Sequence, residues 1–171
     1  SDVCSSDLFA SNISRIQQAI NTAVLYKRKV LVLGRSMVNN VAISQELGYL
    51  DVPEGVLIEA DELNRYTADQ VLILTTGSQG EPMAGLSRMA SNNHRSVSIM
   101  PGDTVIISAT PIPGNETGVG RTIDNLMRLG ARVVFGSNKR IHVSGHGSQE
   151  ELKIMLGLIK PKYFLPVHGE Y

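Results

Sequence analysis

Short apolar runs alternate with amphipathic stretches along almost the whole chain, and this alternation limits the fold more than any other feature. Residues 30–33 (Val-Leu-Val-Leu) and 71–74 (Val-Leu-Ile-Leu) have the length and composition of buried strands. The stretches between such runs repeat apolar residues at helical spacing and end near glycine or proline. The pattern therefore predicts an α/β fold with a mainly parallel sheet flanked by helices.

Turns that leave the strands of such a sheet are expected to meet at one edge, because crossover connections are right-handed. Open parallel sheets bind their ligands at that edge. The turn at 75–80 (Thr-Thr-Gly-Ser-Gln-Gly) could cradle a phosphate, although no Gly-Lys-Ser/Thr follows, so it is not a Walker loop. Arg35 and Arg88 could pair with phosphates. The turns predicted at this edge are 34–36, 76–81, 109–116 and the one at Ser137.

The last thirty residues hold three of the four histidines. Residues 148–151 (Ser-Gln-Glu-Glu) form a capping box, which predicts a helix from Gln149 that Pro161 ends. Residues 163–167 are then expected to form a short buried strand. The helix and the strand after it are expected to run in opposite directions over nearly the same length. We therefore expect the side chains of His146 and His168 to lie within about 10 Å of each other.

The chemistry of this region suits an anion. Ser144 offers a hydroxyl, Gly145 lets the backbone approach a ligand, and a helix that begins here presents N–H groups with a positive dipole. His142 and His146 can donate hydrogen bonds or protons. His168 follows the predicted strand, a position suited to a metal ligand. The alternative is an ordinary strand-to-helix turn. His94, in contrast, has no motif around it and is interpreted as a surface residue.

Composition excludes some classes of protein. Sixteen basic and sixteen acidic side chains give zero net charge, so any contact with nucleic acid must be local. A single cysteine, Cys4, excludes an internal disulfide and suits a reducing compartment. No apolar run approaches the ~18 residues of a membrane span, and the polar start does not read as a signal peptide. We therefore expect one soluble cytoplasmic domain with no membrane partner.

Residues 1–8 do not read as the start of a domain. Asp2, Ser5, Ser6 and Asp7 are poor strand formers. We interpret 1–8 as a non-native or damaged junction and exclude it from the expected fold.

Residues 142–152 (His-Val-Ser-Gly-His-Gly-Ser-Gln-Glu-Glu-Leu) and 166–170 (Pro-Val-His-Gly-Glu) resemble the last two motifs of the β-CASP family of metallo-β-lactamase-fold nucleases, nearest to the ribonuclease J group. The resemblance extends from about Phe9 to the end through residues 75–82 and 107–116. It implies a Rossmann-like β-CASP domain at 9–160. Residues 161–171 would be a strand and motif that return to a metallo-β-lactamase domain outside this sequence.

The resemblance also implies a function, namely metal-dependent hydrolysis of RNA phosphodiesters by the parent enzyme with 5′-to-3′ exonuclease and endonuclease action. His168 would be a metal ligand, and His146 would be catalytic, as a proton donor or oxyanion stabiliser. The Zn²⁺ two-metal centre would take most of its ligands from elsewhere, since no His-x-His-x-Asp-His motif occurs here. RNA would be the partner, the full-length form a homo-oligomer, and the isolated fragment inactive. The substrate-binding residues would be His142, Val143, Ser144, Gly145 and His146.

Two other classes remain open. One is a non-catalytic phosphate- or RNA-binding module with this fold. The other is a doubly wound nucleotide-binding domain, which would want Gly-x-Gly-x-x-Gly after its first strand, where this chain has Gly34-Arg-Ser-Met. Sequence upstream of this chain would separate enzyme from module, because a His-x-His-x-Asp-His motif there would decide for the enzyme.

Overall fold

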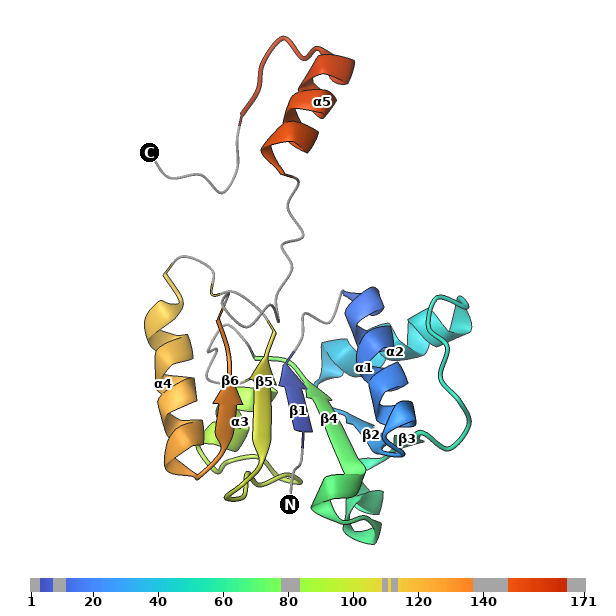
Figure 1. The fold of residues 1–171 in the computed structure, drawn as a ribbon, viewed down its shortest axis with the longest axis vertical. Helices are drawn as coiled ribbons and strands as arrows, with labels where there is room; N and C mark the ends of the chain where they lie inside the picture. Colours follow the sequence, from blue (N-terminus) through green and yellow to red (C-terminus); the bar gives the residue numbers. More distant parts are fainter. Residues whose placement is uncertain are drawn as a thin grey trace.

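A six-stranded parallel sheet forms the centre of the protein (Figure 1). The computed structural model describes residues 12–77, 84–108, 111, 114–136 and 148–165, together with the backbone of 4–7. The strand order is β3-β2-β4-β1-β5-β6, and every pairing between neighbouring strands is parallel. The predicted α/β class with a mainly parallel sheet is confirmed. The strands are β1 Cys4–Asp7, β2 Lys29–Val32, β3 Leu57–Ile58, β4 Val71–Thr75, β5 Thr104–Ile107 and β6 Arg132–Val134.

Helices cover both faces of the sheet. The helices α1 (Ile13–Leu25) and α2 (Arg35–Glu46) pack on one face, and α3 (Gly85–Ala90) and α4 (Glu116–Arg128) pack on the other. Two short 3₁₀ helices, η1 (Ala60–Arg65) and η2 (Ala68–Gln70), precede β4. This layered arrangement is the one that the strand–helix alternation predicts.

Alternation along the central strands divides the core into two layers. In β4, Leu72 and Leu74 face the α1–α2 layer, where they join Ile16 and Ile20. Ile73 of the same strand faces the opposite layer with residues of α3 and α4. All five residues of β4 are buried, as expected for a strand covered on both faces.

The strand β1 corrects the exclusion of residues 1–8. The backbone of Cys4–Asp7 lies in the middle of the sheet, paired with β4 on one side and β5 on the other. Its composition is poor for a strand, but ladders on both sides outweigh intrinsic propensity, which is strongly context-dependent. The origin of residues 1–8 is a separate matter and stays a prediction.

The C-terminal helix is confirmed and the strand after it is not. Helix α5 (Gln149–Ile159) begins at the predicted capping box, in which the Ser148 backbone N–H donates to Glu151 Oε2 at 2.6 Å. That bond, with the Ser148 side chain, holds the pKa of Glu151 below its ordinary value. Residues 163–165 form no strand and are exposed. The prediction of a buried strand is therefore wrong for 163–165, which have no neighbouring strand to pair with among the described residues, while 166–167 lie outside them.

Helix α5 also differs from the expected crossover helix. It stands apart from both layers, and none of its residues is buried (Figure 1). Its apolar side chains are therefore exposed rather than packed on the sheet, as at Leu152 and Met155. No helix in the described part of the chain has the length and apolar character needed to cross a bilayer.

The one histidine in the described part, His94, lies at the surface as predicted and also has a structural role. It is half-buried, and its Nδ1 accepts hydrogen bonds from the backbone N–H groups of Ser96 (3.3 Å) and Val97 (3.2 Å). Val97 and Ile99 beyond this turn are buried against the α3–α4 layer. Burial, and secondarily the charge of Arg88, lower the pKa of His94 below its ordinary value of 6.5.

A depressed folded-state pKa means that the unfolded chain binds the proton more readily. The contribution of His94 to stability should thus be complete above about pH 6.5 and should be lost as the pH falls through its lower folded-state pKa. His94→Asn keeps an acceptor near the position of Nδ1. We expect it to match the wild type at pH 8 and to remove part of the decline in unfolding free energy between pH 6.5 and 5, measured by urea titration. Parallel curves for the two proteins would contradict this assignment.

Candidate functional site at the carboxyl edge of the sheet

The residues to which the sequence assigns the chemistry lie outside the described part of the chain. Their roles, and the expected proximity of His146 and His168, stay predictions. The residues concerned are His142, Val143, Ser144, Gly145, His146 and His168.

The described turns do gather at one edge, as predicted. Because all strands run in the same direction, the residues that follow β2, β4 and β5 share the carboxyl edge of the sheet. The chain leaves β2 towards β3 and leaves β4 towards β5, so the connections diverge at the β2/β4 boundary. They diverge again at the β1/β5 boundary, since β1 is followed by α1 and β5 by α4 on opposite faces. Such switch points are where open α/β sheets bind ligands.

The β2/β4 boundary brings Gly34 close to Thr76. Gly34 has φ 98°, and a Cβ at this position would lie 3.0 Å from Thr76 Oγ1. Only glycine fits this conformation and this close approach without strain. The Thr76 carbonyl accepts from the backbone N–H of Leu86 at 3.1 Å, which ties the first turn of α3 to the same edge.

Arg35 opens α2 directly after Gly34. It is exposed, and the N-cap residue, Gly34, has no side chain that could cap the first turn of the helix. A cation at a helix N-terminus opposes the dipole, so Arg35 does not serve the stability of α2. Its guanidinium and the backbone N–H groups of the first turn together make this spot favourable for an anion. The other arginine singled out from the sequence, Arg88, lies instead in the last turn of α3 and donates to the Asn93 carbonyl at 3.4 Å.

The β1/β5 boundary is closed by Arg15, which the sequence reasoning missed. Arg15 lies in the first turn of α1, where its Nη1 donates to the Ser108 carbonyl at 2.5 Å and to Ser108 Oγ at 2.9 Å. Ser108 is buried immediately after β5. The side chain of Arg15 therefore clamps α1 to the start of the β5–α4 connection. One feature of the sequence could have indicated this role. Arg15 lies in a first turn that has no acidic residue, where a positive charge is unfavourable for the helix dipole, so its position suggests a partner elsewhere in the fold.

The far end of the same connection is also held. Glu116, the first residue of α4, accepts a hydrogen bond from the backbone N–H of Gly114 at 2.8 Å. The connection from β5 to α4 is thus fixed at Ser108 and again at Gly114. The beginning of α4 lies at the carboxyl edge because this helix follows β5.

A metal centre cannot be built from the described residues alone. Among 12–77, 84–108, 111, 114–136 and 148–165, no three His, Cys, Asp or Glu side chains gather closely enough to hold a metal ion. Catalytic zinc typically needs three protein ligands. The described donor set therefore does not fit a complete zinc site, and His168 lies outside it.

The fold and this edge define a class: a doubly wound α/β domain with a polar, locally cationic carboxyl edge. A sequence model described as "Ribonuclease J, beta-CASP domain" matches residues 5–126, and one described as "Zn-dependent metallo-hydrolase RNA specificity domain" matches 131–171. The chain belongs to the ribonuclease J family and contains its β-CASP domain. The three-histidine segment falls within the second match. Neither match tests the predicted boundary at residue 160.

Curated relatives agree over almost the whole chain. The chain is 55% identical over 163 residues to "Ribonuclease J 1" of Streptococcus pyogenes, covering 95% of the chain and 29% of that protein. It is 54% identical to "Ribonuclease J" of Helicobacter pylori over 95% of the chain and 24% of that protein. "Ribonuclease J2" of Bacillus subtilis is 49% identical over 96% of the chain and 29% of its own length. The chain thus spans about a quarter of the length of these relatives.

The clamp between Arg15 and Ser108 can be tested by stability. Arg15→Met keeps the aliphatic stem but removes the donors, and we expect it to lower the unfolding free energy by about 1.5–3 kcal/mol, the range for hydrogen bonds to charged groups. Arg95→Met is the control, because Arg95 is exposed and should shift stability by no more than about 0.5 kcal/mol. The clamp would be refuted if the two variants unfolded at the same urea concentration.

Proposed function

We propose that this chain is the β-CASP part of a metal-dependent ribonuclease that hydrolyses RNA phosphodiesters. The observation that carries the proposal is the match to proteins named ribonuclease J, at 45–55% identity over about 95% of the chain. A parallel sheet with switch points at its carboxyl edge is consistent with a ligand site there.

Within that enzyme, this chain binds the RNA phosphate at the carboxyl edge. Support comes from the exposed Arg35 at the N-terminus of α2 and from the close approach of Gly34 to Thr76. The net charge is zero, so binding depends on such placed groups rather than on a general basic field. The segment from His142 to His146 supplies further donors through its side chains and through the N–H groups of Val143 and Gly145.

His168 supplies one ligand to the metal centre of the parent, and the remaining ligands come from outside this chain. When bound, metal ions in such enzymes lower the pKa of water and polarise the phosphoryl oxygens. A single histidine cannot hold a catalytic zinc ion, so the isolated chain is expected to be inactive.

His146 donates a proton or a hydrogen bond during cleavage of the phosphodiester. An imidazole has an ordinary pKa near 6.5, so it can donate a proton or a hydrogen bond at neutral pH. Beside the scissile phosphate, His146 stabilises charge on a phosphoryl oxygen or protonates the leaving oxygen.

The finer properties follow from the family resemblance alone. They are 5′-to-3′ exonuclease together with endonuclease action, zinc as the metal, a homo-oligomeric full-length enzyme and a cytoplasmic location.

Three variants of the full-length parent separate these roles. His168→Ala should reduce metal content, since a ligand is lost. His146→Ala should keep the metal but slow cleavage by roughly 10²-fold or more, the range for a general acid. Ser144→Ala should mainly weaken RNA binding, by about 1–2 kcal/mol for one hydroxyl. Metal content by mass spectrometry and single-turnover cleavage measure each effect.

The controls are direct. Without the rest of the parent, the 171-residue chain should not cleave RNA with added zinc or manganese. Robust chelator-sensitive cleavage by this chain alone would overturn the assignment of the metal centre. Loss of metal in His146→Ala, with metal retained in His168→Ala, would show that the two roles are reversed.

A further inference from the structure

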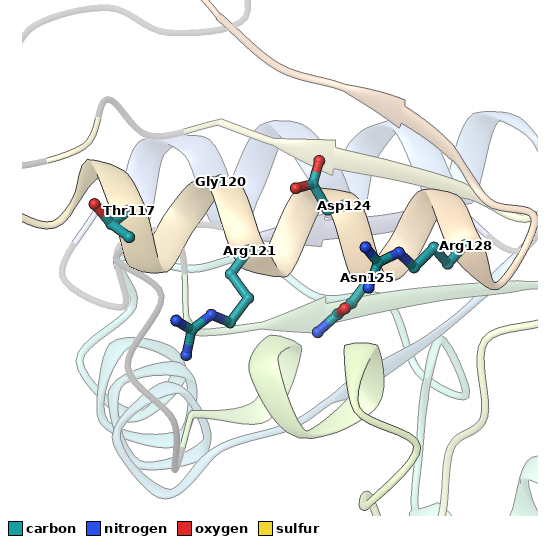
Figure 2. A pocket seen from close by; sticks show the side chains of 6 residues that line it. All are labelled: Thr117, Gly120, Arg121, Asp124, Asn125 and Arg128. Carbon is teal, nitrogen blue, oxygen red and sulfur yellow. The ribbon is translucent and has the colours of Figure 1, made fainter.

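The outward face of α4 carries a line of polar groups that begins at the carboxyl edge. We call these residues the α4 stripe: Thr117, Gly120, Arg121, Asn125 and Arg128. They line an open hollow of ≈ 520 Å³ together with Asp124 (Figure 2). The opposite face of the helix, with Val119, Ile123 and Leu126, is buried in the core. The α4 stripe therefore faces away from the sheet for the length of the helix.

The two arginines of the stripe have no acidic partner among the described residues. Arg121 and Arg128 are exposed, and neither forms a salt bridge there. They lie seven residues apart, which places them two turns or about 10.5 Å apart along the helix. Figure 2 shows Arg121 and Asn125 extending from one side of α4, while the carboxylate of Asp124 points to the other side. Arg121 and Asn125 thus present hydrogen-bond donors and positive charge on the side away from that carboxylate, whereas Arg128 lies one turn after Asp124.

Gly120 adds an independent observation. It lies within α4, where glycine is less favourable than alanine. A Cβ at this position would meet no atom within 4 Å, so packing against the described residues does not require glycine. The missing side chain leaves the backbone open at this position, one helical turn before Asp124.

We propose that the α4 stripe binds the phosphodiester backbone of a single RNA strand that continues beyond the carboxyl edge. The inference rests on the proposed function, because it takes RNA to be the ligand of that edge. Arginine, threonine and asparagine are side chains that commonly contact phosphates. The 13 residues of α4 span about 20 Å, the length of roughly five or six stacked nucleotides.

An acidic protein surface could in principle meet the same arginines. The start of α4 favours RNA, because Thr117 lies in its first turn at the carboxyl edge.

The experiment uses the 171-residue chain and fluorescein-labelled oligouridylates of 4 and 12 nucleotides. The double variant Arg121→Gln/Arg128→Gln should weaken binding of the 12-mer by roughly tenfold at 0.1 M salt, and should reduce the salt slope by about 1.4 for two lost phosphate contacts. Binding of the 4-mer, which occupies only the edge, should not change. Lys27→Gln/Arg95→Gln is the matched control, because it removes the same charge from two exposed residues outside α4 that form no salt bridge among the described residues.

Gly120→Ala excludes misfolding as an explanation. Alanine should stabilise the helix and raise the Tm by about 2 °C, while its methyl group weakens binding of the 12-mer. A variant that is more stable yet binds the long RNA less tightly supports direct contact at this position.

Several results would overturn the stripe. The first is equal effects of the stripe and control variants on the 12-mer. The second is that polyglutamate, at equal total charge, displaces the labelled 12-mer as well as unlabelled RNA does, which would indicate an acidic protein partner. If the 4-mer binds but the stripe variants change nothing, the stripe fails and the proposed function stands. If neither RNA binds the wild-type chain, both fail.

Discussion

Parallel pairing of β1 with β4 and β5 is the constraint on which the rest of the structure depends. The four residues of β1 join strands that lie more than sixty positions further along the chain, and they bring β4 and β5 to either side of one axis. Because every pairing is parallel, each strand ends at the same edge. Helices then leave that edge for opposite faces, and the carboxyl edge collects Gly34, Arg35, Thr76 and Ser108. The candidate site is thus a consequence of strand direction rather than of any single motif.

Elements with strong local signals could be predicted from the sequence. The apolar run of β4 and the capping box at Ser148 gave the strand and the start of α5 correctly. β1 could not be predicted, because Cys-Ser-Ser-Asp has little intrinsic preference for a strand and pairs only through distant partners. The opposite error occurred at 163–165, where an apolar run forms no strand because no partner lies beside it among the described residues. Both failures are of one kind, since strand formation depends on neighbours that a local pattern does not contain.

The candidate site also has parts that the sequence predicted and parts that it did not. Glycine and hydroxyl residues after strands predicted the carboxyl edge, and Gly34 and Thr76 do meet there. Arg15 was missed because its partner, Ser108, lies 93 positions away. The histidine segment was predicted from its spacing and from family resemblance, and it lies outside the described residues. The described part of the candidate site is therefore favourable for an anion, whereas the roles of the histidines are a proposal.

The most direct test of this account is to map where RNA contacts the folded chain. Backbone amide resonances of the ¹⁵N-labelled 171-residue chain would be followed while a 12-nucleotide oligouridylate is added. We predict that the largest shifts occur at the carboxyl edge, at Gly34, Arg35, Thr76 and Gly77, and continue into the first turn of α4. Shifts confined to the opposite edge, around Gly55 and Gly102, would contradict it.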